Sequence, residues 1–116
     1  MADVLRSDAD PFVQVPNWIL FHDDLDGNAI RVWGAIASHL RPGKTTAWPS
    51  RDTLQELTHL SRNTVDRCLR DLRTHGALTW TTVTTAKGKG NVYTLRSVRP
   101  KRRAKTFLFS VEDRVL

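Results

Sequence analysis

Residues 48–78 read WPSRDTLQELTHLSRNTVDRCLRDLRTHGAL, and this stretch decides the fold. Its first residues are Trp48, Pro49 and Ser50. A serine hydroxyl before a helix can accept hydrogen bonds from the unpaired backbone N–H groups of the first turn. Ser50 therefore predicts the start of a short helix, SRDTLQEL, whose leucines recur at helical spacing. We expect this helix to bury Leu54 and Leu57.

A second helix follows after a tight turn at residues 58–60, in which Leu60 is the apolar residue expected to face inward. Ser61 is the expected cap, and the helical pattern continues to His75. Gly76 then favours a stop, because glycine readily takes the left-handed conformation that ends many helices. Two short helices joined by a turn of three or four residues are typical of a helix-turn-helix.

Upstream, residues 12–20 are apolar but interrupted by Pro16, which predicts an extended arm packed on the domain rather than a long helix. Asp26 is a suitable cap for a helix over residues 26–41, which the sequence Arg-Pro-Gly at 41–43 would end. One face of that helix carries apolar residues three or four positions apart, namely Ile30, Trp33, Ile36, Ala37 and Leu40.

Downstream of Gly76 the period changes from helical to alternating. Residues 78–83 and 91–95 are rich in β-branched and aromatic side chains, and the glycine-rich and lysine-rich residues 86–90 between them predict a hairpin loop. Residues 44–48 are also compatible with a short strand. The fold class is therefore mainly α with a small β-hairpin, in the order of elements that defines a winged helix-turn-helix.

The length of 116 residues suits one domain. We expect a flexible acidic lead over residues 1–11, the domain over residues 12–98, and a basic arm followed by an apolar tail over residues 99–116. The single cysteine, Cys68, has no partner for a disulfide, and the four histidines show no ligand spacing with it, so we expect no metal and no cofactor. No segment is long enough to span a membrane, and the acidic N-terminus is unlike a signal peptide. We therefore expect a cytoplasmic protein, associated with the nucleoid if it is bacterial.

The charge is distributed unevenly along the chain. Residues 1–30 carry a net charge of −5, residues 31–76 of +4, and residues 77–105 of +8 with no acidic side chain. A positive potential concentrated in this way attracts a polyanion. Nucleic acid is the partner that this pattern indicates.

The stretch at 48–78 is similar to the "WPS…LA…SR.TV.RAL..L...GL" core of the MarR-like and GntR-like winged-helix superfamily. Residues 15–20 and 29–33 further resemble a helix-turn-helix family found in bacterial mobile elements, phage replication proteins and small regulators. The resemblance covers about residues 12–96 and implies a winged helix that binds double-stranded DNA. The chain has Cys68 where these families usually have alanine.

The helix from Ser61 to His75 would be the one that enters the major groove. A helical wheel places Val65, Cys68, Leu69 and Leu72 on its buried side. On its polar side, arginine can pair with guanine and asparagine with adenine, while aspartate can accept from cytosine. The residues proposed to read bases are Arg62, Asn63, Asp66, Arg67 and Arg70. For Asp66, orienting Arg62 or Arg70 through an i, i+4 pair is the favoured role.

Other residues are candidates for contact with the DNA backbone, through hydroxyls, helix N-termini, or positive charge. At the serines, simple capping is a compatible role, and at the basic residues a solvated surface is the alternative. These candidates are Ser50, Arg51, Ser61, Thr64, Arg73, Lys87, Lys89, Arg99, Lys101, Arg102 and Arg103.

The sequence leaves several roles open. The leading hypothesis is a transcriptional regulator that binds a specific DNA sequence, and the alternative is the DNA-binding module of a plasmid or phage replication or partition system. A protein-interaction adaptor is a further class, although it would favour an apolar or acidic helix face. An enzyme is not expected, because no nucleophile and base or carboxylate pair is evident. The N-terminal arm, the first helix and the C-terminal tail are candidate surfaces for a homodimer.

Overall fold

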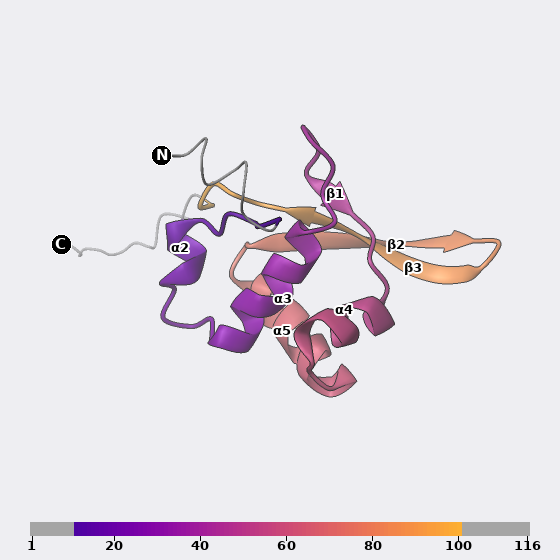
Figure 1. Ribbon diagram of the computed structural model, residues 1–116, viewed down its shortest axis with the longest axis horizontal. Coiled ribbons are helices and arrows are strands. Elements are labelled where there is room, and N and C mark those ends of the chain that lie inside the picture. The colour runs from indigo at the N-terminus through magenta and orange to yellow at the C-terminus, as the bar shows by residue number, and fades with distance from the viewer. Residues whose placement is uncertain (1–10, 101–116) are drawn as a thin grey trace.

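The structure, a computed structural model, describes residues 11–100 and consists of four helices and a small antiparallel sheet (Figure 1). The three strands lie in the order β1-β3-β2. This arrangement confirms the predicted fold class. The elements are α2 (Asn17–Leu20), α3 (Gly27–Ala37), β1 (Thr46–Ala47), α4 (Arg51–Thr58), α5 (Arg62–Thr74), β2 (Leu78–Thr85) and β3 (Gly88–Leu95). The predicted acidic lead and the tail beyond Pro100, with Lys101, Arg102 and Arg103, lie outside the described residues.

Three helices begin at the caps that the sequence indicates. The side chains of Asp26, Ser50 and Ser61 each accept a hydrogen bond from the backbone N–H three residues ahead, which satisfies one of the unpaired donors of the first turn. The distances from the capping oxygens to the backbone nitrogens are 2.9 Å for Ala29, 3.1 Å for Thr53 and 3.3 Å for Thr64. The starts of α3, α4 and α5 are therefore set by local chemistry.

The inward face of α4 differs from the prediction. Leu54 is buried as expected, but Leu57 is 48% exposed and Thr58 is buried instead. Leu54 and Thr58 are four residues apart and so share one face of the helix, and the Thr58 hydroxyl donates to the Leu54 carbonyl at 2.6 Å. Burial of Thr58 is possible because this bond satisfies its polar group. The prediction for Leu57 was wrong.

The boundaries of the other elements also shift. The helix α3 ends at Ala37 rather than at residue 41, and a turn follows in which the Ser38 hydroxyl donates to the Ala35 carbonyl. The arm at residues 12–20 is irregular as expected except for the single turn of α2 after Pro16. The hairpin is longer than predicted, because its strands meet at a turn of two residues instead of a five-residue loop.

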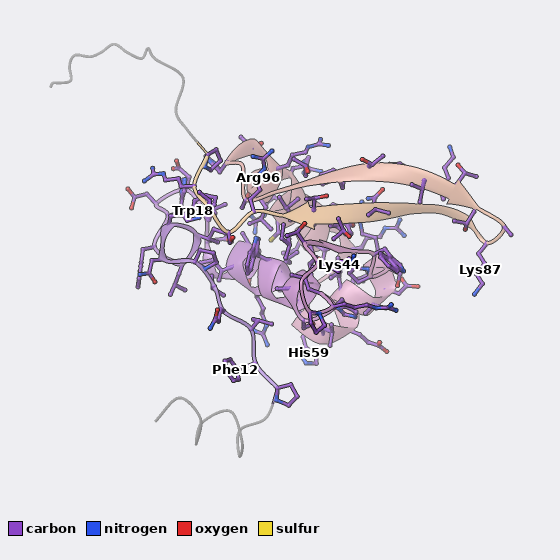
Figure 2. All side chains as sticks on the ribbon, turned by 90° about the horizontal axis from the view of Figure 1, so that it is seen from above. Phe12, Trp18, Lys44, His59, Lys87 and Arg96 are labelled. Atoms are coloured by element: carbon purple, nitrogen blue, oxygen red, sulfur yellow. The ribbon has the colours of Figure 1, made fainter. Side chains whose placement is uncertain are left out.

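The core lies between α3, α5 and the inner half of the sheet. The predicted buried side of α5, formed by Val65, Cys68, Leu69 and Leu72, is confirmed. Burial raises the pKa of the Cys68 thiol, so it remains a neutral core side chain. Two indole N–H groups join segments that are distant in sequence. Trp33 donates to the Ala77 carbonyl at 3.1 Å within the core, and Trp18 of α2 donates to the Ser97 carbonyl at 2.9 Å at the surface. Figure 2 shows Trp18 beside the end of the sheet that is far from the hairpin tip.

Gly76 ends α5 in the left-handed region, with φ at +77°. A Cβ atom at this position would lie 2.5 Å from Cγ of Pro100, so the residue after the helix must be small as well as left-handed. Gly43 has nearly the same φ, +76°, but nothing lies within 4 Å of its Cβ position. Comparing the same substitution at Gly43 and Gly76 therefore separates the cost of the left-handed conformation from the cost of steric overlap with Pro100.

We predict that Gly76→Ala lowers the free energy of unfolding by clearly more than Gly43→Ala. The second change should cost about 1–2 kcal/mol for the left-handed alanine alone, whereas the first adds the displacement of Pro100. Urea unfolding of both variants followed by circular dichroism measures the difference. Equal losses would show that the segment at Pro100 moves away without cost.

Candidate nucleic-acid interface

The solvent-facing side of α5 is polar and mainly cationic. Its buried stripe fixes the rotation of the helix, so the residues on the opposite side must face water. The exposed residues of this helix are Arg62, Asn63, Arg70, Arg73 and Thr74. In Figure 1, α5 lies on the side of the domain opposite the loop that joins α3 to β1.

Three of the predicted base-reading residues are available for an outside partner. Arg62 and Asn63 lie in the first turn of α5, and Arg70 lies two turns further on. Among residues 11–100, no carboxylate lies within ion-pair distance of either arginine, and no hydrogen bond engages the Asn63 amide. These side chains present unsatisfied donors to solvent.

Arg67 differs from them because its guanidinium already contacts two carboxylates. One nitrogen lies 3.0 Å from Asp26, the cap of α3, and another lies 2.9 Å from Asp71 in the next turn of α5. The guanidinium thus joins the start of α3 to the middle of α5. Reading a base with Arg67 would require it to give up at least one of these contacts, and its predicted role stays a prediction.

Asp66 pairs with Arg51 of α4 rather than with Arg62 or Arg70, so the favoured i, i+4 role was wrong. The Arg51 and Asp66 atoms lie 3.0 Å apart, and each side chain retains only 30% of its exposure. Arg51 Nη1 and Asp66 Oδ1 are close enough for an ion pair, but their relative orientation does not form a hydrogen bond. The Arg51 side chain is half-buried in this ion pair, and its contact with the DNA backbone stays a prediction. The pair fixes α4 against α5.

Arg73, a predicted backbone contact, lies at the other end of α5. Its guanidinium carbon is 3.8 Å from the centre of the Trp80 ring on β2, which is cation–π geometry. Trp80 in turn meets Tyr93 of β3 edge to face. The charge of Arg73 is thereby held beside the base of the hairpin, while its side chain remains exposed.

The hairpin forms the wing. Residues 83–85 of β2 and the paired residues 88–90 of β3 are all exposed, so the end of the hairpin extends roughly 10 Å beyond the core. Lys87 lies in the two-residue turn, and its backbone N–H donates to the Thr85 hydroxyl. Lys89 lies in β3 rather than in the loop. Figure 2 shows Lys87 at the far tip, the end opposite Trp18 and Arg96.

The remaining candidates lie at helix starts or near the end of the described chain. Ser50 and Ser61 are exposed caps whose hydroxyls also contact those of Thr53 and Thr64 at 3.0 Å. Their capping role is confirmed, and phosphate contact by either serine or by Thr64 stays a prediction. Arg99 is exposed after the wing.

The charge of Arg67 contributes to the lowered pKa of Asp26, the capping residue of α3. The pKa of Asp26 is lowered from its usual value, first by the hydrogen bond from the Ala29 backbone and then by the charge and hydrogen bond of Arg67. Sequence reasoning found the cap but missed the ion pair, because its partners lie 41 residues apart. The start of α3 and the middle of α5 are thus coupled through a carboxylate that remains ionised.

Residues 23–78 match the family model of a helix-turn-helix domain. No curated protein and no solved structure matches the chain. The match covers α3, α4 and α5, and a domain of this class suggests DNA binding and is typically a non-enzymatic module. Together with the small antiparallel sheet, the match fits a winged helix-turn-helix fold. Within residues 11–100, no helix has both the length and the apolar character needed to cross a membrane.

We predict that Asp26→Asn lowers stability at neutral pH by less than about 1 kcal/mol, because asparagine still caps the helix but loses the charge pair of an exposed site. A carboxylate with a lowered pKa stabilises the fold above its usual titration range and loses that contribution as the pH falls through the lowered value. The stability difference between wild type and Asp26→Asn should therefore shrink as the pH falls through the lowered pKa of Asp26.

Urea unfolding across this pH range tests this decrease. Glu56→Gln, an exposed change on α4, serves as the matched control and should stay offset from wild type by a small amount. A difference between wild type and Asp26→Asn that persists undiminished at low pH would contradict the assigned ion pair.

Proposed function

We propose that this protein binds a specific sequence of double-stranded DNA, with α5 in the major groove and the wing on the flanking backbone, and that it acts as a transcriptional regulator. The observation that carries the proposal is the exposed face of α5, where Arg62, Asn63 and Arg70 have no partner among the described residues. A helix with this face fits the width of the major groove.

The position of Arg62 and Asn63 supports base reading. In helix-turn-helix proteins the first residues of the second helix reach the base edges, and both residues lie in the first turn of α5. The guanidinium can donate two parallel hydrogen bonds to guanine, and the amide can donate to and accept from adenine. Two adjacent groups with different preferences can distinguish a sequence, which charge alone cannot do.

The other basic groups support contact with phosphates. Lys87 and Lys89 lie on a hairpin that projects beyond the core, and Arg73 and Arg99 are exposed near its base. Such contacts position a protein on DNA without reading its sequence. The N-termini of α4 and α5, with Ser50 and Ser61, offer backbone N–H groups to the same anions.

The two salt bridges that join different helices support this proposal. Arg51 with Asp66 holds α4 against α5, and Arg67 with Asp26 holds α5 against α3. The base-reading helix is therefore presented in one orientation, which reduces the ordering cost of binding. Asp66 and Arg67 contribute by holding the helix and reach DNA only by exchanging their present partners.

We predict that selection from random duplex DNA enriches a motif, and that Arg62→Ala and Asn63→Ala each weaken binding to that motif by about 1–3 kcal/mol. Each change should also relax the base preference at one position of the motif. Mobility shifts on the selected site and on single-base variants measure both effects. Arg41→Ala, in the loop on the side opposite α5, removes the same charge and should bind like wild type (Figure 1). Failure to enrich any motif would overturn base reading.

For the wing, we predict that Lys87→Ala weakens binding to all sequences alike and reduces the slope of log affinity against log salt by about one. Fluorescence anisotropy at several salt concentrations gives the slope. Lys44→Ala is the matched control, because Lys44 is exposed in the loop between α3 and β1, and this loop lies on the side of the domain opposite α5 (Figure 1). Figure 2 shows Lys44 away from Lys87 at the hairpin tip. If the two lysine variants have the same slope, the wing does not contact phosphate.

A further inference from the structure

Two histidines and an aspartate meet at the end of the domain that lies far from the wing. His22 and Asp24 belong to the segment between α2 and α3, and His75 is the C-cap residue of α5. One ligand atom from each lies within 4.8 Å of the other two. The two imidazole rings have centres 4.7 Å apart and are tilted by 54°. The spacing of these residues along the chain does not indicate a metal site, because the fold rather than the local chain brings the three groups together.

The surrounding backbone holds the three residues in place. The segment that carries His22 and Asp24 is anchored on one side by buried Ile19 and on the other by buried Leu25. The backbone N–H of Leu25 also donates to the His22 carbonyl. His75 is fixed by its backbone N–H, which donates to the Asp71 carbonyl, and by the left-handed turn at Gly76.

The local electrostatics favour a cation between these residues. The carboxylate of Asp24 is exposed and forms no salt bridge within residues 11–100. His75 lies at the C-terminus of α5, where the helix dipole presents its negative end. The two half-buried imidazoles lie side by side, so both can serve as nitrogen donors to one shared metal ion.

We propose that His22, Asp24 and His75 form a binding site for a divalent transition-metal ion, with Zn²⁺ as the ion that this donor set suits best. Two imidazole nitrogens and one carboxylate oxygen are typical zinc ligands, and water would complete a tetrahedron. The site is spatially separate from the proposed DNA interface, since none of its residues belongs to the exposed face of α5.

The geometry requires only small movements of side chains. In a tetrahedral zinc site with bonds near 2.1 Å, ligand atoms lie about 3.4 Å apart. The present separations, at most 4.8 Å, therefore have to shorten by up to roughly 1.4 Å. Rotations of the His22 and Asp24 side chains in the turn can supply this change without moving α5.

One existing contact would be exchanged. Nδ1 of His22 now accepts a hydrogen bond from the Asp24 backbone at 3.1 Å, in an exposed position. Coordination through Nδ1 replaces that bond, and coordination through Nε2 shifts the ring proton to Nδ1 and breaks it as well. The protein ligands displace water from the ion, and the cost within the protein is the loss of this one solvent-accessible hydrogen bond.

A bound ion would connect the segment after α2 to the end of α5. These parts are far apart in sequence, so the ion closes a long loop and should raise the stability of the fold more than a local site would. The structural effect would be to fix α2 and its arm on the domain (Figure 1).

The test is calorimetric titration of tag-free, chelator-treated full-length protein with ZnCl₂, with thermal unfolding measured in parallel. We expect one ion per chain and a rise in Tm that chelator reverses. His22→Gln and His75→Gln should each weaken zinc binding by roughly 100-fold or more, since even outer-shell changes cost 10- to 100-fold. Asp24→Asn keeps the size and backbone of the residue and should also weaken binding.

His39→Gln is the matched control, because His39 is exposed on the segment after α3 and is not part of the cluster. It should bind zinc like wild type. No saturable binding by wild type, or unchanged affinity in folded His75→Gln and Asp24→Asn, overturns the proposal. Because the readout needs no DNA, its failure and the failure of the proposed function are distinguishable.

Discussion

The packing of α5 against α3 and the sheet is the constraint on which the rest of the structure depends. Four apolar side chains of α5, Val65, Cys68, Leu69 and Leu72, are removed from water almost completely. The hydrophobic free energy of burying them sets the rotation of the helix about its axis. Once that rotation is set, every other residue of α5 has its direction assigned. The basic face is therefore a consequence of the core and not a separate feature of the surface.

This dependence explains why so much could be predicted from the sequence. The caps at Asp26, Ser50 and Ser61 and the buried stripe of α5 depend on residues within four positions of one another, and local patterns report such contacts directly. The left-handed stop at Gly76 is of the same kind. The exposed positions of Arg62, Asn63 and Arg70 followed from the stripe by helical geometry alone.

The parts that could not be predicted depend on contacts between distant segments. Asp66 has arginines at both i, i+4 positions, yet it pairs with Arg51, because the angle between α4 and α5 brings that guanidinium closer. Leu57 is exposed although it is apolar, because the direction of α4 buries Thr58. The length of the hairpin also could not be predicted. Its outer residues are all exposed, so no alternation of buried and exposed positions indicates in the sequence where each strand ends. Their length is set by pairing as far as Thr85 with Gly88.

The two ends of α5 differ in a way that fits a division of roles along one helix. Its N-terminus carries a serine cap, Arg62 and Asn63, and a positive dipole end that favours anions such as phosphate. Its C-terminus carries His75 beside His22 and Asp24, and a negative dipole end that favours cations. Between them, Arg67 joins the helix to the cap of α3, so neither end can rotate without disturbing an ion pair. An event at the C-terminal end that fixes the segment before α3 would also hold Asp26, and through Arg67 it would hold the orientation of the groove-facing side chains.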